Sequence, residues 1–114
     1  MNAPSFKQLT KDGTIKRADA MKVRLDDIHE EPGFNLRDIF AVDEDGVTFQ
    51  ESIRQLAEFI KQGGQIPPLE VRPRAEGGVW LVDGHRRRLA LRMLRDEIHY
   101  PIDEWVNVVR SEEH

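Results

Sequence analysis

Residues 79–94 constrain the fold most, because their hydrophobic pattern changes from that of a strand to that of a helix across one glycine. Residues 79–82 are four consecutive apolar residues, and Asp83 and Gly84 then give a stop signal typical of a strand end. The apolar residues that follow are spaced to gather on one side of a helix: Leu89, Ala90, Met93 and Leu94. The sequence therefore predicts a buried strand, a tight turn and a helix.

The start of the predicted helix is suited to hold an anion, because its first N–H groups have no partner within the helix and the dipole is positive there. Arg86 and Arg87 fall in this first turn, Arg86 along the middle of the apolar stripe and Arg87 along its edge. The interaction of a cation with the helix dipole is unfavourable there by about 0.3–1 kcal/mol, so both guanidiniums need a negatively charged partner. Asp83 is one candidate. A phosphate ligand is the other, and we prefer it because it satisfies the N–H groups, the dipole and both arginines together.

The three later arginines of this helix have a simpler interpretation. Arg88, Arg92 and Arg95 share a face opposite the apolar stripe, and we interpret that face as solvated.

Composition sets outer limits on the fold and the chemistry. A chain of 114 residues that is 39% hydrophobic and 33% charged is typical of one globular domain with a modest core. It has no cysteine, which excludes disulfides, zinc-thiolate sites and thiol catalysis. No apolar run approaches the length of a membrane span, so we expect a cytoplasmic protein that does not contact the membrane.

Charge is distributed unevenly along the chain, although the net charge is only −4. Residues 61–95 contain eight basic residues against three acidic ones, whereas residues 96–114 contain six acidic residues and Arg110 as the single Lys or Arg. A basic middle with an acidic end fits a local phosphate site better than an extended surface for wrapping DNA.

The remaining elements follow from periodicity and turn signals. Thr48 and Glu51 form a capping box, and apolar residues with helical spacing follow from Phe49 to Ile60, so a helix is predicted there.

Residues 1–20 have no clear period and are interpreted as a flexible or late-docking arm. One domain over residues 21–110 and a tail over 111–114 follow this arm. His29, beside two glutamates, is interpreted as surface charge and not as a metal ligand, and no metal site is predicted.

Strands are predicted at residues 21–25, 69–73, 79–82 and 105–109. The second and third of them are expected to form a hairpin. The predicted fold is a small α/β (α+β) domain with a mixed sheet and two main helices.

At these residues the chain resembles the N-terminal domain of ParB-type partition proteins, whose fold is shared with sulfiredoxin. The resemblance extends over residues 21–110 in order and spacing. The matching segments are residues 23–28 (VRLDDI), 35–37 (NLR) with Phe40, 65–73 (QIPPLEVRP) and 82–87 (VDGHRR). It implies a pocket for the phosphates of a nucleoside triphosphate, CTP or ATP with or without Mg²⁺, and by position the pocket residues Arg37, Gly84, Arg86 and Arg87. His85, which lies between Gly84 and Arg86, is a further candidate phosphate-binding residue.

The chain departs from these families at His85, where partition proteins usually have glutamate and sulfiredoxins have the catalytic cysteine. Leu89 stands where an arginine is common. Reduction of sulfinic acids is therefore excluded. The chain also lacks room for the helix-turn-helix module with which partition proteins read DNA, so we expect only weak, non-specific nucleic-acid binding.

Two classes of function remain. The first is a nucleotide-binding module or switch in a partition-like, plasmid or phage DNA-maintenance system, with a homodimer or another protein as partner. The second is a hydrolase, either a ParB-like nuclease or a nucleotide hydrolase, in which His85 and Asp83 are the candidate catalytic residues. We prefer binding, because one histidine and one aspartate two residues apart do not by themselves make a catalytic site.

Overall fold

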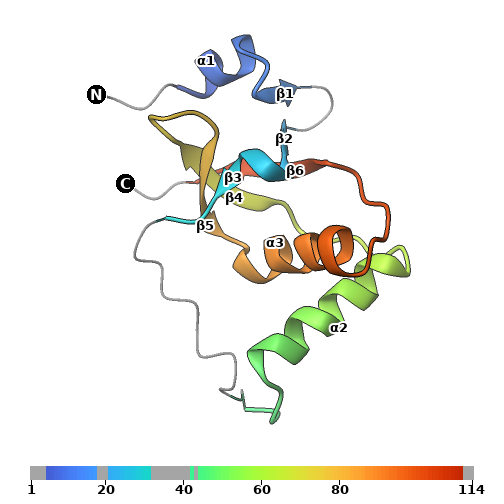
Figure 1. Ribbon diagram of the computed structural model, residues 1–114. Helices are drawn as coiled ribbons and strands as arrows, with labels where there is room; N and C mark the ends of the chain where they lie inside the picture. Colours follow the sequence, from blue (N-terminus) through green and yellow to red (C-terminus); the bar gives the residue numbers. More distant parts are fainter. Residues whose placement is uncertain (1–4, 18–20, 32–41, 43, 112–114) are drawn as a thin grey trace. The chain divides into compact units, whose positions relative to one another are not determined.

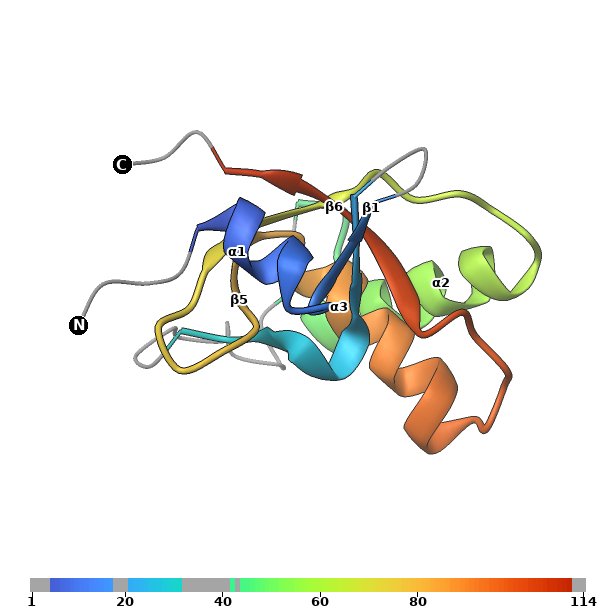
Figure 2. The ribbon, with the colours of Figure 1, turned by 90° about the horizontal axis from the view of Figure 1, so that it is seen from above.

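The computed structural model describes residues 5–17, 21–31, 42 and 44–111, and its described elements form a mixed α+β fold (Figures 1 and 2). They fall into two compact units. The sheet unit contains the described residues up to 31, residues 67–84 and residues 103–111, and the helical unit contains the described residues of 42–66 and residues 85–102.

The sheet unit is built on six strands in the order β1-β2-β6-β4-β5-β3. Neighbouring strands are antiparallel except for two parallel pairs, β4 with β6 and β3 with β5. The strand bounds are β1 Ile15–Arg17, β2 Met21–Arg24, β3 Ile28–His29, β4 Leu69–Pro73, β5 Val79–Asp83 and β6 Trp105–Arg110. A 3₁₀ turn, Leu25–Asp27, joins β2 to β3.

Alternation along the strands places one set of side chains in the core. Leu69, Val71, Val79 and Leu81 are at most 2% exposed, and Val71 lies opposite Leu81 in the antiparallel ladder. The predicted hairpin of β4 and β5 is therefore confirmed, and Pro73 is the last residue of its strand.

Gly78 closes this hairpin and is required there for two reasons. Its φ is 69°, a conformation that side-chain-bearing residues rarely adopt. A Cβ at this position would also lie 2.5 Å from the backbone oxygen of Asp27. The hairpin tip thus approaches the 3₁₀ turn closely enough to exclude any side chain.

The N-terminal segment contains elements that the sequence pattern does not predict. Residues 6–11 form the helix α1 (Phe6–Lys11), whose first turn is capped by the Ser5 side chain accepting from the Gln8 N–H. The strand β1 pairs with β2, and Leu9 and Ile15 are at most 2% exposed. The described residues of this segment are part of the sheet unit.

The helical unit contains α2 (Phe49–Lys61) and α3 (His85–Arg92), the latter continued by a π-helical turn, η2 (Met93–Glu97). The side chain of Thr48 accepts a hydrogen bond from the Glu51 N–H at 3.0 Å, so the predicted start of α2 is confirmed. The core of this unit is a buried cluster drawn from both helices: Ile53, Ala57, Ala90 and Leu94. All four apolar residues predicted for the helix after Gly84 pack in or against this cluster, namely Leu89, Ala90, Met93 and Leu94.

Across the part of the chain that the structure describes, no helix is long and apolar enough to cross a membrane.

Candidate functional site

The candidate site begins where β5 ends and α3 starts, at a backbone conformation that explains the glycine. Gly84 lies between the exposed Asp83, the last residue of β5, and His85, the first residue of α3. Its φ is 108°, so a residue with a side chain would be strained there. The predicted strand, turn and helix are therefore present, and the first turn of α3 carries the two predicted arginines.

Arg86 is exposed, and its guanidinium carbon lies 5.6 Å from the centroid of the Phe49 ring. A cation–π contact at an exposed site contributes about 0.5–1 kcal/mol and leaves the N–H donors at the guanidinium edge available. Within the described residues Arg86 makes no ion pair with a carboxylate. An internal carboxylate partner for Arg86 therefore finds no support in this part of the chain.

Asp83, His85 and Arg87 are described by the structure, whereas the fourth of the other predicted site residues, Arg37, is not. Asp83, His85 and Arg87 each take part in at least one interaction, so none of them is uncompensated in the structure. His85 and Arg87 are half-buried. Arg37, which the resemblance adds to the pocket, lies outside the described residues.

The face of α3 that was predicted to be solvated carries ion pairs. Arg95 donates from Nε to Asp96 Oδ1 at 2.8 Å, and the Arg95 side chain is only 21% exposed. Arg92 Nη2 lies 3.8 Å from Asp96 Oδ2. The hydrogen bond from Arg95, with the positive charges of Arg95 and Arg92, lowers the pKa of Asp96. The Arg92 and Asp96 side chains remain 38% and 46% exposed, so this part of the face is in contact with solvent, and what the sequence pattern did not predict is that Asp96 pairs with both arginines.

A pocket of about 350 Å³ lies beside α2 and α3 and was not predicted. Four apolar and four polar side chains line it: Phe49, Gln50, Ile53, Leu89, Arg92, Met93, Asp96 and Glu97. Phe49 connects it to the candidate site, because the ring that lines the pocket also lies under Arg86. The sequence pattern marks these apolar residues as core, but Phe49, Leu89 and Met93 are only partly buried.

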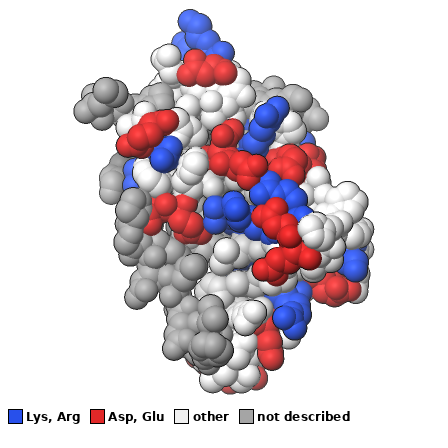
Figure 3. All heavy atoms as spheres, in the orientation of Figure 1, with Lys and Arg blue, Asp and Glu red and all other residues white. Residues whose placement is uncertain are grey.

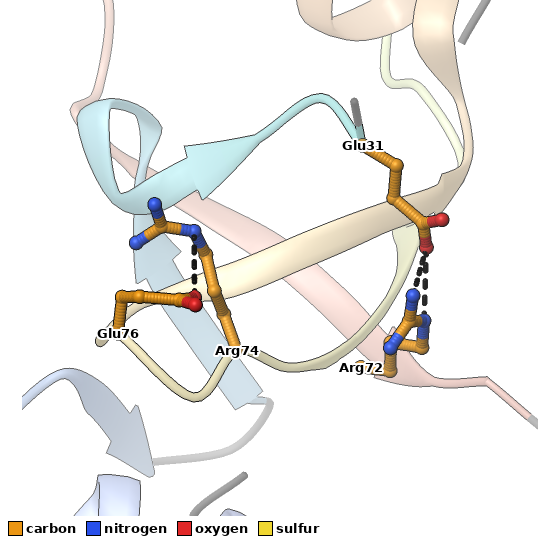
Figure 4. Close-up of polar contacts among 4 residues, drawn as sticks. All are labelled: Glu31, Arg72, Arg74 and Glu76. Atoms are coloured by element: carbon orange, nitrogen blue, oxygen red, sulfur yellow. Dashed lines mark hydrogen bonds and ion pairs between the residues drawn. The ribbon is translucent and has the colours of Figure 1, made fainter. Parts of the chain in front are cut away.

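Two arginines of the basic middle segment are held in the sheet unit and take no part in the candidate site (Figure 4). Arg72 donates from both Nε and Nη2 to the same oxygen, Glu31 Oε1, and the Nε donor lies 2.9 Å from it. Arg74 donates from Nη1 to the Gly77 oxygen at 3.0 Å, and its guanidinium lies over the Trp80 ring. Counting charges along the sequence therefore overstates the cations available for phosphate.

The chain has a net charge of −4, and acidic as well as basic side chains are visible in the space-filling view of Figure 3. We therefore expect DNA to bind weakly, with a dissociation constant of about 10⁻⁴–10⁻⁶ M, and to be released as salt is raised, because counterion release would supply the affinity. A gel-shift titration across salt concentrations with two unrelated DNA sequences measures this. Tight, sequence-selective binding at physiological salt would contradict the expectation.

Among the described residues, no group of three or more His, Asp or Glu side chains is arranged to hold a metal ion. The sequence matches no protein-family model and none of the curated proteins with which it was compared.

Proposed function

We propose that the chain is a nucleotide-binding module of the ParB/sulfiredoxin type, which binds the phosphates of a nucleoside triphosphate at the first turn of α3. The observation that carries the proposal is Arg86, an exposed guanidinium at the second residue of this helix, without a carboxylate partner in the described part of the chain. A helix start followed by such a cation favours an anionic ligand.

The ligand is held in this proposal by three kinds of donor. Backbone N–H groups of the first turn of α3 bind one phosphate, as at other helix N-termini. Arg86 and Arg87 add charged donors, which bind phosphate more strongly than neutral ones do. Arg37 closes over the ligand, a role that rests on the resemblance alone.

The Arg86→Ala variant tests the proposal directly. We expect it to lose about 1.5–3 kcal/mol of binding free energy, roughly 10- to 100-fold in affinity, because a charged hydrogen-bond partner of phosphate is removed. Calorimetry with ATP, CTP and GTP, with and without magnesium, measures the loss and identifies the preferred base.

Arg54→Ala is the matched control, since Arg54 is an exposed arginine on α2 outside the candidate site. It should bind like the unaltered chain. Equal losses in the two variants would show that phosphate responds to overall charge and that the assignment to α3 is wrong.

The proposed setting is a partition-like plasmid or phage DNA-maintenance system in the cytoplasm, where a bound triphosphate changes the affinity for a partner protein. Hydrolysis of a phosphoester, as nuclease or nucleotide hydrolase, is the alternative. It is favoured by Asp83 and His85, which flank Gly84 and combine a carboxylate with an imidazole.

A further inference from the structure

The pocket beside α2 and α3, which we term the η2 pocket, combines an apolar part with charged side chains. Its apolar side chains are buried or half-buried: Phe49, Ile53, Leu89 and Met93. Its charged side chains are half-buried or exposed: Arg92, Asp96 and Glu97. Its volume of about 350 Å³ lies at the lower end of the roughly 300–1,000 Å³ of small-molecule pockets, which are likewise mostly apolar with a few polar groups. The η2 pocket therefore has room for a ligand about as large as an amino acid.

The charged side chains of the η2 pocket differ in how far their charges are compensated. Arg95 holds Asp96 through two hydrogen bonds, from Nε to Oδ1 at 2.8 Å and from Nη2 to Oδ2 at 3.3 Å. Arg92 Nη2 lies farther away, 3.8 Å from Asp96 Oδ2. The Glu97 carboxylate makes no ion pair with any side chain in the described part of the chain. A ligand in the pocket would thus meet one guanidinium, from Arg92, and one uncompensated carboxylate, from Glu97.

The π-helical turn η2 supplies one apolar side chain and both carboxylates of the pocket, from Met93, Asp96 and Glu97. Within it the Ile98 N–H bonds to the Met93 oxygen, five residues back, at 3.0 Å. Such turns are rare in helices and occur frequently at functional sites. The position of the pocket on this turn is a second reason, besides its volume and charge, to expect a ligand there.

Charge limits which small molecules fit the η2 pocket. An apolar amine would meet Arg92 as a like charge, and an apolar carboxylate would meet Glu97 as a like charge. An uncharged apolar molecule would remove water from both side chains without replacing its hydrogen bonds. A molecule that carries an ammonium group, a carboxylate and an apolar group compensates both side chains and also covers the apolar part of the pocket.

We propose that the η2 pocket binds a free α-amino acid with an apolar side chain, such as leucine. The apolar group packs against Phe49 and Met93. The ammonium group donates to Glu97, and Arg92 donates to the carboxylate. Because these charged side chains are partly exposed to water, binding is weak, with a dissociation constant of about 0.1–1 mM. The site uses neither Arg86 nor the first turn of α3, so it is separate from the proposed phosphate site.

A titration of the whole chain with leucine and three analogues, followed by NMR spectroscopy without nucleotide, tests the proposal. Isoamylamine lacks the carboxylate of leucine, isocaproate lacks its ammonium group, and glycine lacks its apolar group. We expect leucine to bind at least about 10-fold more tightly than each analogue, with the largest shift changes at Leu89 and Met93. An analogue that binds as tightly as leucine would overturn the proposal, as would the absence of binding by both leucine and phenylalanine at about 10 mM.

Two variants separate the two charged contacts. Glu97→Gln removes the negative charge at constant size, so we expect leucine to bind at least about fivefold more weakly while isocaproate binds equally well or better. Arg92→Gln should weaken leucine binding by a similar factor while isoamylamine binds equally well or better. Glu58→Gln, at an exposed position of α2 outside the pocket, is the control and should bind leucine like the unaltered chain.

The Glu97→Gln result is decisive even if Arg92→Gln disturbs folding through its ion pair with Asp96, since Glu97 is exposed and makes no ion pair in the described part of the chain. Equal losses in Glu97→Gln and Glu58→Gln, or an unchanged leucine affinity in Glu97→Gln, would overturn the proposal. These measurements need no nucleotide, so their outcome is independent of the outcome for the phosphate site.

Discussion

Leu94→Ala is expected to lower the free energy of unfolding by about 2–5 kcal/mol, the range for truncating a buried leucine. Leu94 is 0% exposed and packs between Ile53 and Ala57 of α2 and Ala90 of α3. Removing three heavy atoms there leaves a cavity that two packed helices cannot close completely. Urea titration followed by circular dichroism measures the change.

Ile98→Ala is the matched control for this substitution. Ile98 lies four residues further along the chain and is 45% exposed, so its truncation removes little buried area. We expect a loss below about 1 kcal/mol. Equal losses for both variants would mean that the cluster of α2 and α3 is not the core of the helical unit in solution.

The second large effect is expected at His85 and separates the two functions. If the chain hydrolyses its ligand with His85 as general base, His85→Gln should depress turnover by about 10²–10⁴-fold while changing affinity little. If the chain is a binding module, as we propose, neither protein should release phosphate or nucleotide above the background rate. Phosphate release and calorimetric affinity, measured on both proteins with nucleoside triphosphate and with DNA, decide between these results.

His99→Asn is a suitable control for that experiment. His99 is exposed and has a φ of 58°, a conformation that asparagine tolerates better than most residues. Turnover that falls in both variants would indicate a general loss of folding, and turnover that survives in the His85 variant would exclude this histidine as the base.

The sequence predicts best those elements that local patterns determine. The capping box at Thr48 and the helical spacing after it give α2, and the glycine that ends β5 gives the start of α3. The helix α1 was missed because six residues provide too short a period. Its stability comes instead from packing, through Leu9, which local pattern does not reveal.

Features that depend on distant residues could not be predicted. The parallel pairing of β4 with β6 joins Leu69 to Val108, and no local signal specifies such a partner. At the candidate site the sequence identifies Arg86 but not the Phe49 ring beneath it, which comes from a different helix. The ion pair between Arg72 and Glu31 joins residues 41 positions apart, so the charge pattern alone could not show that Arg72 is already paired.

The π-helical turn has a consequence for the length of the chain. In η2 the Ile98 N–H bonds to the Met93 oxygen at 3.0 Å, five residues back, so this turn holds one residue more than an α-helical turn. Tyr100 follows and donates its hydroxyl to the Lys61 oxygen at the end of α2. Loss of one residue within 95–97 would let the turn revert to α-helical spacing with Leu94 still in the core. The same loss within 86–92 would rotate every later side chain by about 100° and remove Leu94 from the core. The end of η2 is therefore where descendants of this chain can change length without refolding the two helices.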